Sequence, residues 1–401
     1  MHPAVSKVQD EPLKTLEVEI ERILPGGVGL AHGEALTLLV SLAAPGDVVR
    51  VQIDRVRGKL AFASVLEVIK PSPVRVEPPC PYFGRCGGCD FQQLTYEAQL
   101  KAKVAIIRDC LHRIAHIETP PEIDIHASPN QWHYRARANW QFDPQANRLG
   151  YFERGSHRVC DVEYCAVLVP ELQQTLEALR AQIAQDSFRP ERRDIEAVAG
   201  AEAVSLSPAF ASSQTNEVTR TIANETYYFN ADAFFQTNHE LLDSLITETT
   251  GEIHGQIAID LYCGVGLFTL PLARGFRQVV GIEASATASR FARRNLQDAQ
   301  LLNAQIVTSQ VGDWLRDNSV SFAAVDFLLL DPPRSGVEGR VVAGILAMRP
   351  RRICYVSCDP ATLARDLKKL LAGGYALDSV AAFDMFPQTH HVETVARLSS
   401  T

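Results

Sequence analysis

Cysteine is the residue type that most needs a chemical explanation in this sequence, because three cysteines fall within ten positions. The stretch "CPYFGRCGGC" covers residues 80 to 89, and a disulfide, a metal site or a catalytic thiol could each explain it. The first residues, "MHPAVSKVQDEPLK", contain no apolar segment of the kind that directs secretion. We therefore expect a cytoplasmic protein, in which disulfides are rare, and the odd total of nine cysteines also fits a disulfide framework poorly.

A further cysteine, Cys358, follows an apolar segment in "YVSCDPATLARDLKK". Asp359 is a good N-cap and Pro360 a good first helical residue, so the thiol is expected just before a helix. The positive end of the helix dipole should lower the pKa of the thiol and favour the thiolate, although Asp359 partly opposes this. Cys263 and Cys354 are expected to be small buried side chains without a chemical role.

The elements that must position these residues are most regular after about residue 255. Apolar strands alternate there with helical stretches, in the order "QIAIDLYC", "QVVGIEA", "AQIVTS", "VDFLLLDPP", "RRICYVSC" and "SVAAFDMF". This alternation is typical of an α/β fold with a doubly wound parallel sheet. Ligands bind at the carboxyl ends of such strands, so Cys358 is expected at the binding edge.

A glycine turn follows the first of these strands, in "AIDLYCGVGLFTLPLA". Gly264 and Gly266 would let the backbone approach a ligand, and Glu283, which ends the second strand, could accept hydrogen bonds from ribose hydroxyls. A dinucleotide site would have a third glycine where Thr269 stands. We therefore favour S-adenosylmethionine (SAM), which has no pyrophosphate, over NAD, and expect "LLLDPPRSGV" to bring Asp331 to the same crevice.

A thiol beside a methyl donor indicates a particular reaction. C5 of a pyrimidine is not nucleophilic enough to take a methyl group directly, but addition of a thiolate to C6 makes C5 enolate-like. A base must then remove the C5 proton so that the thiol can leave. Glu393, which lies between apolar residues in "HHVETVARL", is expected to be buried with a raised pKa and to act as this base, with His390 and His391 as alternatives.

The chain before residue 255 is less regular. Residues 14 to 69 are predicted to form short strands of a small barrel of OB type, and residues 92 to 116 have apolar residues at helical spacing. Residues 125 to 228 are predicted to form a mixed, mostly β region. The net charge of −8 argues against a wholly basic nucleic-acid-binding protein, but arginines gather locally at Arg135, Arg137, Arg148, Arg154 and Arg158.

With "DLYCGVG", "DPPRSGV", "SCDPATLARDL" and "HHVET" in this order, nearly the whole sequence resembles the RNA uracil-C5-methyltransferases. These enzymes transfer a methyl group from SAM to uridine in ribosomal or transfer RNA. The resemblance implies a Rossmann-like SAM-dependent methyltransferase domain, an N-terminal OB-like (TRAM) RNA-binding barrel and a mixed central iron–sulfur domain. The expected boundaries are residues 1–75 for the barrel, 76–91 with 125–229 for the central domain, and 92–124 with 230–401 for the methyltransferase domain.

The resemblance also implies roles for single residues. Cys358 in "SCDP" matches the nucleophile, and Glu393 in "HVET" matches the base. The positions expected to contact SAM are Gln236 in "AFFQTN", Tyr262, Gly264, Glu283 and Asp331, with either Gln310 or Asp313 after the third strand.

The cysteine-rich loop resembles the iron–sulfur loop found in part of this family, which implies Cys80, Cys86 and Cys89 as ligands. A [4Fe–4S] cluster takes four thiolates. In "VCDVEYCAVLVPEL", Cys165 fits the family pattern of the fourth ligand better than Cys160. Zinc is the alternative metal, because four thiolates also suit a tetrahedral zinc.

We therefore expect a monomeric iron–sulfur RNA 5-methyluridine methyltransferase that acts on 23S ribosomal RNA, with transfer RNA as the alternative substrate and no membrane partner. A non-catalytic RNA-binding or assembly factor is the rival hypothesis from another class, and the presence of both Cys358 and Glu393 argues against it. A redox or NAD-linked enzyme is a third, disfavoured by the missing glycine at Thr269.

Overall fold

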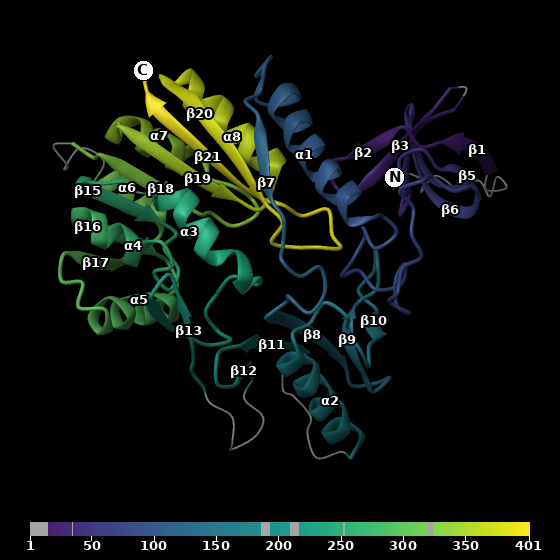
Figure 1. Ribbon diagram of the computed structural model, residues 1–401, viewed down its shortest axis with the longest axis horizontal. Helices are drawn as coiled ribbons and strands as arrows, with labels where there is room; N and C mark the ends of the chain where they lie inside the picture. The colour runs from purple at the N-terminus through teal and green to yellow at the C-terminus, as the bar shows by residue number, and fades with distance from the viewer. Residues whose placement is uncertain (1–14, 34, 186–192, 209–215, 252, 319–323) are drawn as a thin grey trace, which may run out of the picture.

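The computed structural model describes the chain except residues 1–14, 34, 186–192, 209–215, 252 and 319–323 (Figure 1). The described residues form a six-, a five- and an eight-stranded sheet and a two-stranded hairpin. None of the helices in this described part is both long and apolar enough to cross a membrane.

The N-terminal sheet is built from alternately buried strands. Its spatial order is β1 (Thr15–Glu19), β5 (Val48–Arg57), β6 (Leu60–Lys70), β4 (Thr37–Ser41), β3 (Val28–His32) and β2 (Arg22–Leu24). Only two residues separate β1 from β2, so one bent segment of the chain lies at both edges of the sheet. Alternate side chains such as Leu38, Val40, Val49 and Val51 are fully buried and form an apolar cluster between the strands.

The central sheet carries a helix that the sequence analysis did not separate from its mostly β surroundings. The strand order is β10 (Val159–Asp161), β9 (Arg148–Phe152), β8 (Arg137–Asp143), β11 (Asp194–Ala199) and β12 (Val204–Ser207). Helix α2 (Pro170–Ala184) packs Leu172, Leu176 and Leu179 against Trp140 of this sheet. Proline at the first helical position and leucines at i, i+4 and i+7 are the signals that predict it. The hairpin of β13 (Val218–Ile222) and β14 (Glu225–Phe229) follows.

The C-terminal sheet is the doubly wound sheet that the alternation of strands and helices predicts. Its order is β17 (Ala304–Thr308), β16 (Phe276–Glu283), β15 (Gly255–Leu261), β18 (Phe327–Leu330), β19 (Arg352–Ser357), β21 (Glu393–Ser400), β20 (Tyr375–Phe383) and β7 (Ile123–His126). Within this sheet, β21 runs antiparallel to both of its neighbours. The order reverses between β15 and β18, and such a switch point opens a crevice at the carboxyl ends of the strands.

Helices cover both faces of this sheet (Figure 1). On one face lie α1 (Tyr96–Arg113), α6 (Val311–Asn318), α7 (Gly339–Met348) and α8 (Pro360–Ala372). On the other lie the short helix η1 (His239–Leu241), α3 (Leu242–Thr250), α4 (Thr269–Gly275) and α5 (Ala286–Asp298). Helix α1 comes from far earlier in the chain, yet its buried Ile106, Ile107 and Leu111 share one apolar cluster with α8.

Candidate active site and thiol-lined cavity

The glycine turn after β15 is held by the acidic residue that ends β16. Tyr262, Gly264 and Gly266 all have positive φ values, of 64°, 55° and 92°, so the chain turns sharply away from the strand. The Gly264 amide donates to Glu283 Oε2 (3.0 Å), and the Ser285 amide donates to Glu283 Oε1 (2.6 Å). The carboxylate of Glu283 therefore lies at the crevice, between the turn and the start of α5.

Thr269 has a role that a glycine could not fill. Its hydroxyl donates to the carboxylate of Asp260, at 2.5 Å, and both side chains are completely buried. Burial raises the pKa of Asp260 to about 7, while the hydrogen bond from Thr269 opposes this shift. The residue that departs from the dinucleotide pattern thus supports the turn through its side chain.

Asp331 and Gln236 meet at the end of β18. Gln236 is buried, and its Nε2 donates to Asp331 Oδ2 at 3.4 Å. Burial raises the pKa of Asp331 to about 7. Asn238, two residues beyond Gln236, caps η1 and donates to Ser128 Oγ at 2.9 Å, which is a structural role.

The two candidates after β17 differ in how freely their side chains could reach a ligand. Asp313 lies in the first turn of α6, where its carboxylate accepts hydrogen bonds from Arg316 (3.2 Å) and Arg340 (3.0 Å). Gln310 precedes this helix with an exposed side chain. Of the two, Gln310 is therefore the better candidate for a SAM contact.

Strand register places Cys358 and Glu393 side by side. Ser357 pairs with Thr394 across β19 and β21, which are antiparallel. Cys358 follows Ser357 and Glu393 precedes Thr394, so the two reactive side chains extend the same pairing at the edge where β15 and β18 end. Glu393 is 2% exposed, and its Oε1 has no hydrogen-bond partner. A buried carboxylate oxygen without a donor is suited to accept a proton.

Burial controls the pKa of both groups. It raises the pKa of Glu393 well above its usual value, with a further contribution from Asp331, as the sequence analysis predicts. It also raises the pKa of Cys358 to about 12, reinforced by the negative charge of Glu393. The predicted lowering by the helix dipole is wrong, because the thiol is half-buried beside carboxylates rather than open to water.

The alternative bases differ from Glu393. Burial, His390 and Arg334 lower the pKa of His391 to about 3, so its imidazole is a weak proton acceptor. The Nδ1 of His390 is 2.5 Å from Asp90 Oδ2. Among the three candidates, Glu393 is therefore the one whose free oxygen and raised pKa suit proton removal.

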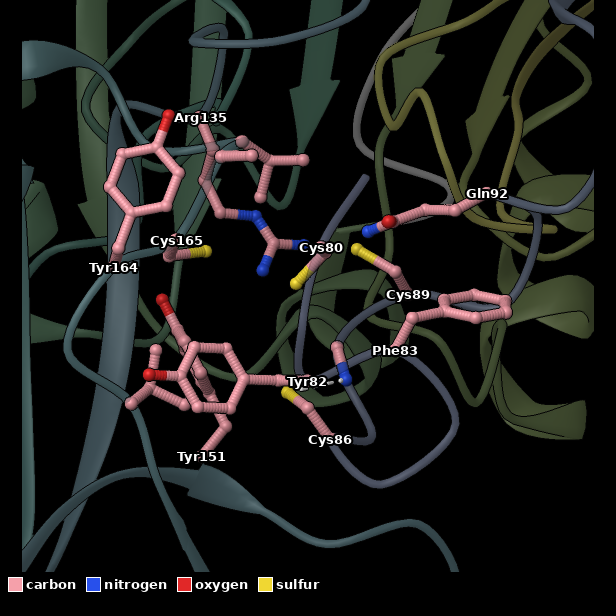
Figure 2. Close-up of a pocket in the computed structure, with 14 residues that line it drawn as sticks. Cys80, Tyr82, Phe83, Cys86, Cys89, Gln92, Arg135, Tyr151, Tyr164 and Cys165 are labelled. Carbon is pink, nitrogen blue, oxygen red and sulfur yellow. Dashed lines mark hydrogen bonds between the residues drawn. The ribbon is translucent and has the colours of Figure 1, made fainter. Parts of the chain in front are cut away.

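A second constellation lies between the cysteine-rich loop and the segment that follows β10. Figure 2 shows the sulfur atoms of Cys80, Cys86, Cys89 and Cys165 facing a shared cavity. Burial raises the pKa of Cys86 to about 11 and that of Cys89 to about 12, and it also raises the pKa of Cys165. The guanidinium of Arg135 lines the same cavity.

The other cysteines do not join this set. Cys160 lies within β10, does not line the cavity, and accepts a hydrogen bond from Arg85 Nε at 3.2 Å. Cys110, Cys263 and Cys354 are buried in apolar clusters, and for Cys263 and Cys354 this is the expected role. In the part of the chain that the structure describes, no three His, Cys, Asp or Glu side chains are grouped as a metal ion would require.

The sheet order and the site at its switch point define a doubly wound α/β protein, and comparisons with known proteins give its family. Residues 209–400 match the family described as tRNA (uracil-5-)-methyltransferase. The 23S rRNA (uracil(1939)-C(5))-methyltransferase RlmD of Pectobacterium atrosepticum is 33% identical, covering 96% of this chain and 94% of the relative. An uncharacterized RNA methyltransferase of Thermosynechococcus vestitus is 32% identical, covering 96% and 98%.

A solved structure is similar over the same extent. The tRNA (uracil-54, C5)-methyltransferase of Pyrococcus abyssi, in complex with S-adenosyl-L-homocysteine, has a TM-score of 0.74 and 25% identity, and the match covers 96% of this chain and 100% of the other. The chain belongs to the RNA uracil-C5-methyltransferase family, as its motifs predicted. Its enzyme class is that of the RNA uracil-5-methyltransferases.

Proposed function

We propose that this protein transfers a methyl group from SAM to C5 of a uridine in RNA, through a covalent bond between Cys358 and C6 of the base. The single observation that carries the proposal is the pairing of β19 with β21, which puts Cys358 beside the buried Glu393 at the edge that holds the glycine turn.

In the proposed reaction the Cys358 thiol loses its proton to water, and its sulfur bonds to C6 of the uracil. The C5–C6 double bond becomes an enolate, and C5 takes the methyl group from the sulfonium of SAM, releasing S-adenosylhomocysteine. Glu393 then removes the C5 proton, the C6–sulfur bond breaks, and 5-methyluridine leaves with the Cys358 thiolate restored. The free Oε1 of Glu393 supports its role in the third step.

SAM would lie against the glycine turn. The Pyrococcus abyssi relative, which was solved with S-adenosyl-L-homocysteine, supports the use of SAM. Glu283 would accept hydrogen bonds from the ribose, and Tyr262, Gly264, Asp331 and Gln236 would line the rest of the site, with Gln310 completing it.

We also propose that Cys80, Cys86, Cys89 and Cys165 hold a [4Fe–4S] cluster. Zinc–sulfur bonds are about 2.3 Å long, so a single zinc would draw its thiolates into a tight group. The four cysteines line one cavity, and four thiolates are the ligand set that such a cluster takes. Buried thiols with raised pKa values need a positive partner to ionise, and Arg135 provides part of it. A bound cluster would cross-link the cysteine-rich loop to the segment after β10.

We propose 23S ribosomal RNA as the substrate, supported by the relative from Pectobacterium atrosepticum, with transfer RNA as the alternative that the Pyrococcus abyssi relative favours. The N-terminal sheet would act as an OB-like (TRAM) RNA-binding barrel. The proposed domains are residues 1–75, residues 76–91 with 125–229, and residues 92–124 with 230–401. We expect a cytoplasmic monomer.

Replacing the base should separate methyl transfer from release. The Glu393→Gln protein keeps the thiol but cannot accept the C5 proton, so methylated RNA should stay bonded to Cys358. With methyl-labelled SAM, this variant should give a labelled protein–RNA band that survives denaturing electrophoresis.

The double change Cys358→Ala with Glu393→Gln is the control and should abolish the band. Normal turnover by Glu393→Gln, with no trapped species, would show that another residue removes the proton. A labelled band that persists without Cys358 would refute the covalent mechanism.

A further inference from the structure

The loop between β20 and β21, residues 384–392, leads directly into Glu393 and is fixed by distant parts of the chain. In Figure 1 this yellow loop extends from the C-terminal sheet toward the blue segment that precedes α1. Glu393 is the first residue of β21, so the loop ends directly at this residue. The conformation of the loop therefore affects the position of the Glu393 carboxylate.

The segment that immediately follows Cys89 makes four hydrogen bonds with this loop. The backbone amides of Asp90 and Phe91 both donate to the carbonyl oxygen of Gln388, each at 3.0 Å. The carboxylate of Asp90 accepts two further hydrogen bonds, from the backbone amide of His390 at 2.8 Å and from its ring Nδ1 at 2.5 Å.

Helix α1 and the segment before β8 hold the rest of the loop. The side chain of Gln99 donates to Gln388 Oε1 (3.0 Å) and accepts from the Gln388 amide (2.9 Å). Lys103 forms a fully buried ion pair with Asp384, and Tyr134 donates to the carbonyl oxygen of Pro387 (2.9 Å). These contacts fix the middle and the start of the loop.

Among these contacts of the loop, the one made by Asp90 is nearest to Glu393 in sequence, because its partner His390 lies three residues before that residue. We propose that Asp90 is a positioning residue for the methyl-transfer reaction, which holds His390 so that Glu393 reaches the C5 proton. Through Asp90, the loop that carries Cys80, Cys86 and Cys89 also sets the geometry of the active site. This inference rests on the proposed role of Glu393.

The physical reason is the distance dependence of proton transfer. A general base must come within hydrogen-bond distance of the proton that it removes, and a displacement of about 1 Å can cost roughly 100-fold in rate. Loss of the Asp90 carboxylate leaves two donors of His390 unpaired and frees the end of the loop. The thiol and the glycine turn belong to other elements and keep their places.

The test compares Asp90→Ala, Asp90→Asn and Glu225→Ala, in preparations matched for iron content. The Asn side chain keeps one acceptor for the His390 amide, so it should rescue part of the function. Glu225 provides the matched control, because its carboxylate also accepts hydrogen bonds from a basic side chain, Arg274, and it is 12% exposed compared with 14% for Asp90.

Two readouts distinguish positioning from general damage. With methyl-labelled SAM and RNA, Asp90→Ala should lower kcat roughly 10- to 100-fold and change KM for RNA less than about twofold. Its labelled protein–RNA adduct should accumulate, because addition and methyl transfer continue while proton removal slows. Hydrogen exchange, which does not depend on activity, should be faster in peptides covering residues 384–393 and unchanged in β19.

Adduct accumulation and the hydrogen-exchange rate of residues 384–393 should both be greatest in Asp90→Ala and intermediate in Asp90→Asn. In Glu225→Ala both should equal the values of the unchanged protein. If Asp90→Ala does not fold, the test compares Asp90→Asn with Glu225→Ala instead. The inference would be overturned if the Asp90 variants showed the same adduct fraction and the same exchange rate as the unchanged protein. If Glu393→Gln itself traps no adduct, the proposed function fails first; if it traps adduct and the Asp90 variants do not, only the present inference fails.

Discussion

Burial sets the protonation states of the two side chains to which the proposed mechanism assigns catalytic roles, Cys358 and Glu393. The Cys358 thiol has its pKa raised to about 12 by burial and by Glu393, so it is protonated at neutral pH. The Glu393 carboxyl also has a raised pKa, because burial and Asp331 disfavour its charge. In the proposed mechanism both groups must ionise before they act, so deprotonation of each at higher pH should favour the reaction.

The rate of adduct formation should therefore rise with pH between 7 and 9. Below the pKa of the thiol, the thiolate fraction increases about tenfold per pH unit. Single-turnover rates with saturating RNA and SAM should show a slope of about one in log rate against pH. A rate that is constant or falls over this range would show that binding of RNA changes the environment of Cys358.

At the scale of single residues, the sequence predicts which residues form the site better than it predicts their pKa shifts. The motifs around Cys358 and Glu393 predict which residues lie together, and the strand register agrees. The direction of the Cys358 pKa shift is predicted wrongly, since the depth of a side chain depends on elements far away in sequence. Likewise, the side-chain role of Thr269 depends on its contact with Asp260, which no motif specifies.

At the scale of elements, the thiol-lined cavity joins two segments that share no secondary structure. The loop with Cys80, Cys86 and Cys89 meets the residues between β10 and α2, where Cys165 lies. The same loop is also bonded to the end of β9 and the residues after it: the Gly87 amide donates to the Phe152 carbonyl (2.9 Å), and Arg154 donates to the Cys89 carbonyl (2.8 Å).

Replacing the two neighbouring cysteines separately should show which one binds iron. Cys165→Ala should lose most of the iron of anaerobically purified protein, expected at about four atoms per chain, and should destabilise the central sheet. Cys160→Ala removes a buried sulfur that does not line the cavity, so it should keep its iron. Iron analysis of both variants tests this, and the reverse pattern would assign Cys160 as the ligand.

Helices and strands whose apolar residues recur with a clear periodicity are predictable from this sequence, whereas those with a weaker pattern are not. The doubly wound sheet follows from its repeated apolar strands, and α1 follows from apolar residues at helical spacing. Helix α2 does not stand out from the mixed, mostly β region predicted for residues 125 to 228, because strands precede and follow it. The edge strand β7 pairs with β20, which lies some 250 residues later, and no local pattern could indicate that pairing.

At the scale of the whole molecule, long-range contacts connect the N-terminal part and the cysteine-rich loop to the C-terminal part of the chain. Ile23 and Ala44 of the N-terminal part share the apolar cluster of α1 and the C-terminal sheet, and Arg22 pairs with Asp109 at 3.2 Å. Contacts such as Asp90 with His390, 300 residues apart, could not be predicted from either motif alone. They nevertheless place the cysteine-rich loop next to the loop between β20 and β21.

If the N-terminal sheet binds RNA, its exposed arginines should contribute to affinity. Arg55, which stacks on Phe62, and Arg57 lie at the exposed end of β5. The double change Arg55→Ala with Arg57→Ala should weaken RNA binding and make the slope of log affinity against log salt shallower by roughly one to two. Filter binding at several salt concentrations measures this.

The matched control is Arg277→Ala with Arg316→Ala, which removes two exposed arginines from the C-terminal part of the chain. This pair should leave affinity and salt slope unchanged. Equal losses in both double variants would mean that the N-terminal sheet has no special role in binding.

The measurement that tests the central claim most directly is a map of 5-methyluridine in ribosomal and transfer RNA from cells with and without this protein. Deletion should remove 5-methyluridine from the 23S ribosomal RNA and leave transfer RNA unchanged, and the unchanged protein should restore the modification whereas Cys358→Ala should not. Loss from transfer RNA instead would select the alternative substrate. If the 5-methyluridine maps of both RNAs were the same in cells with and without the protein, the account would be contradicted.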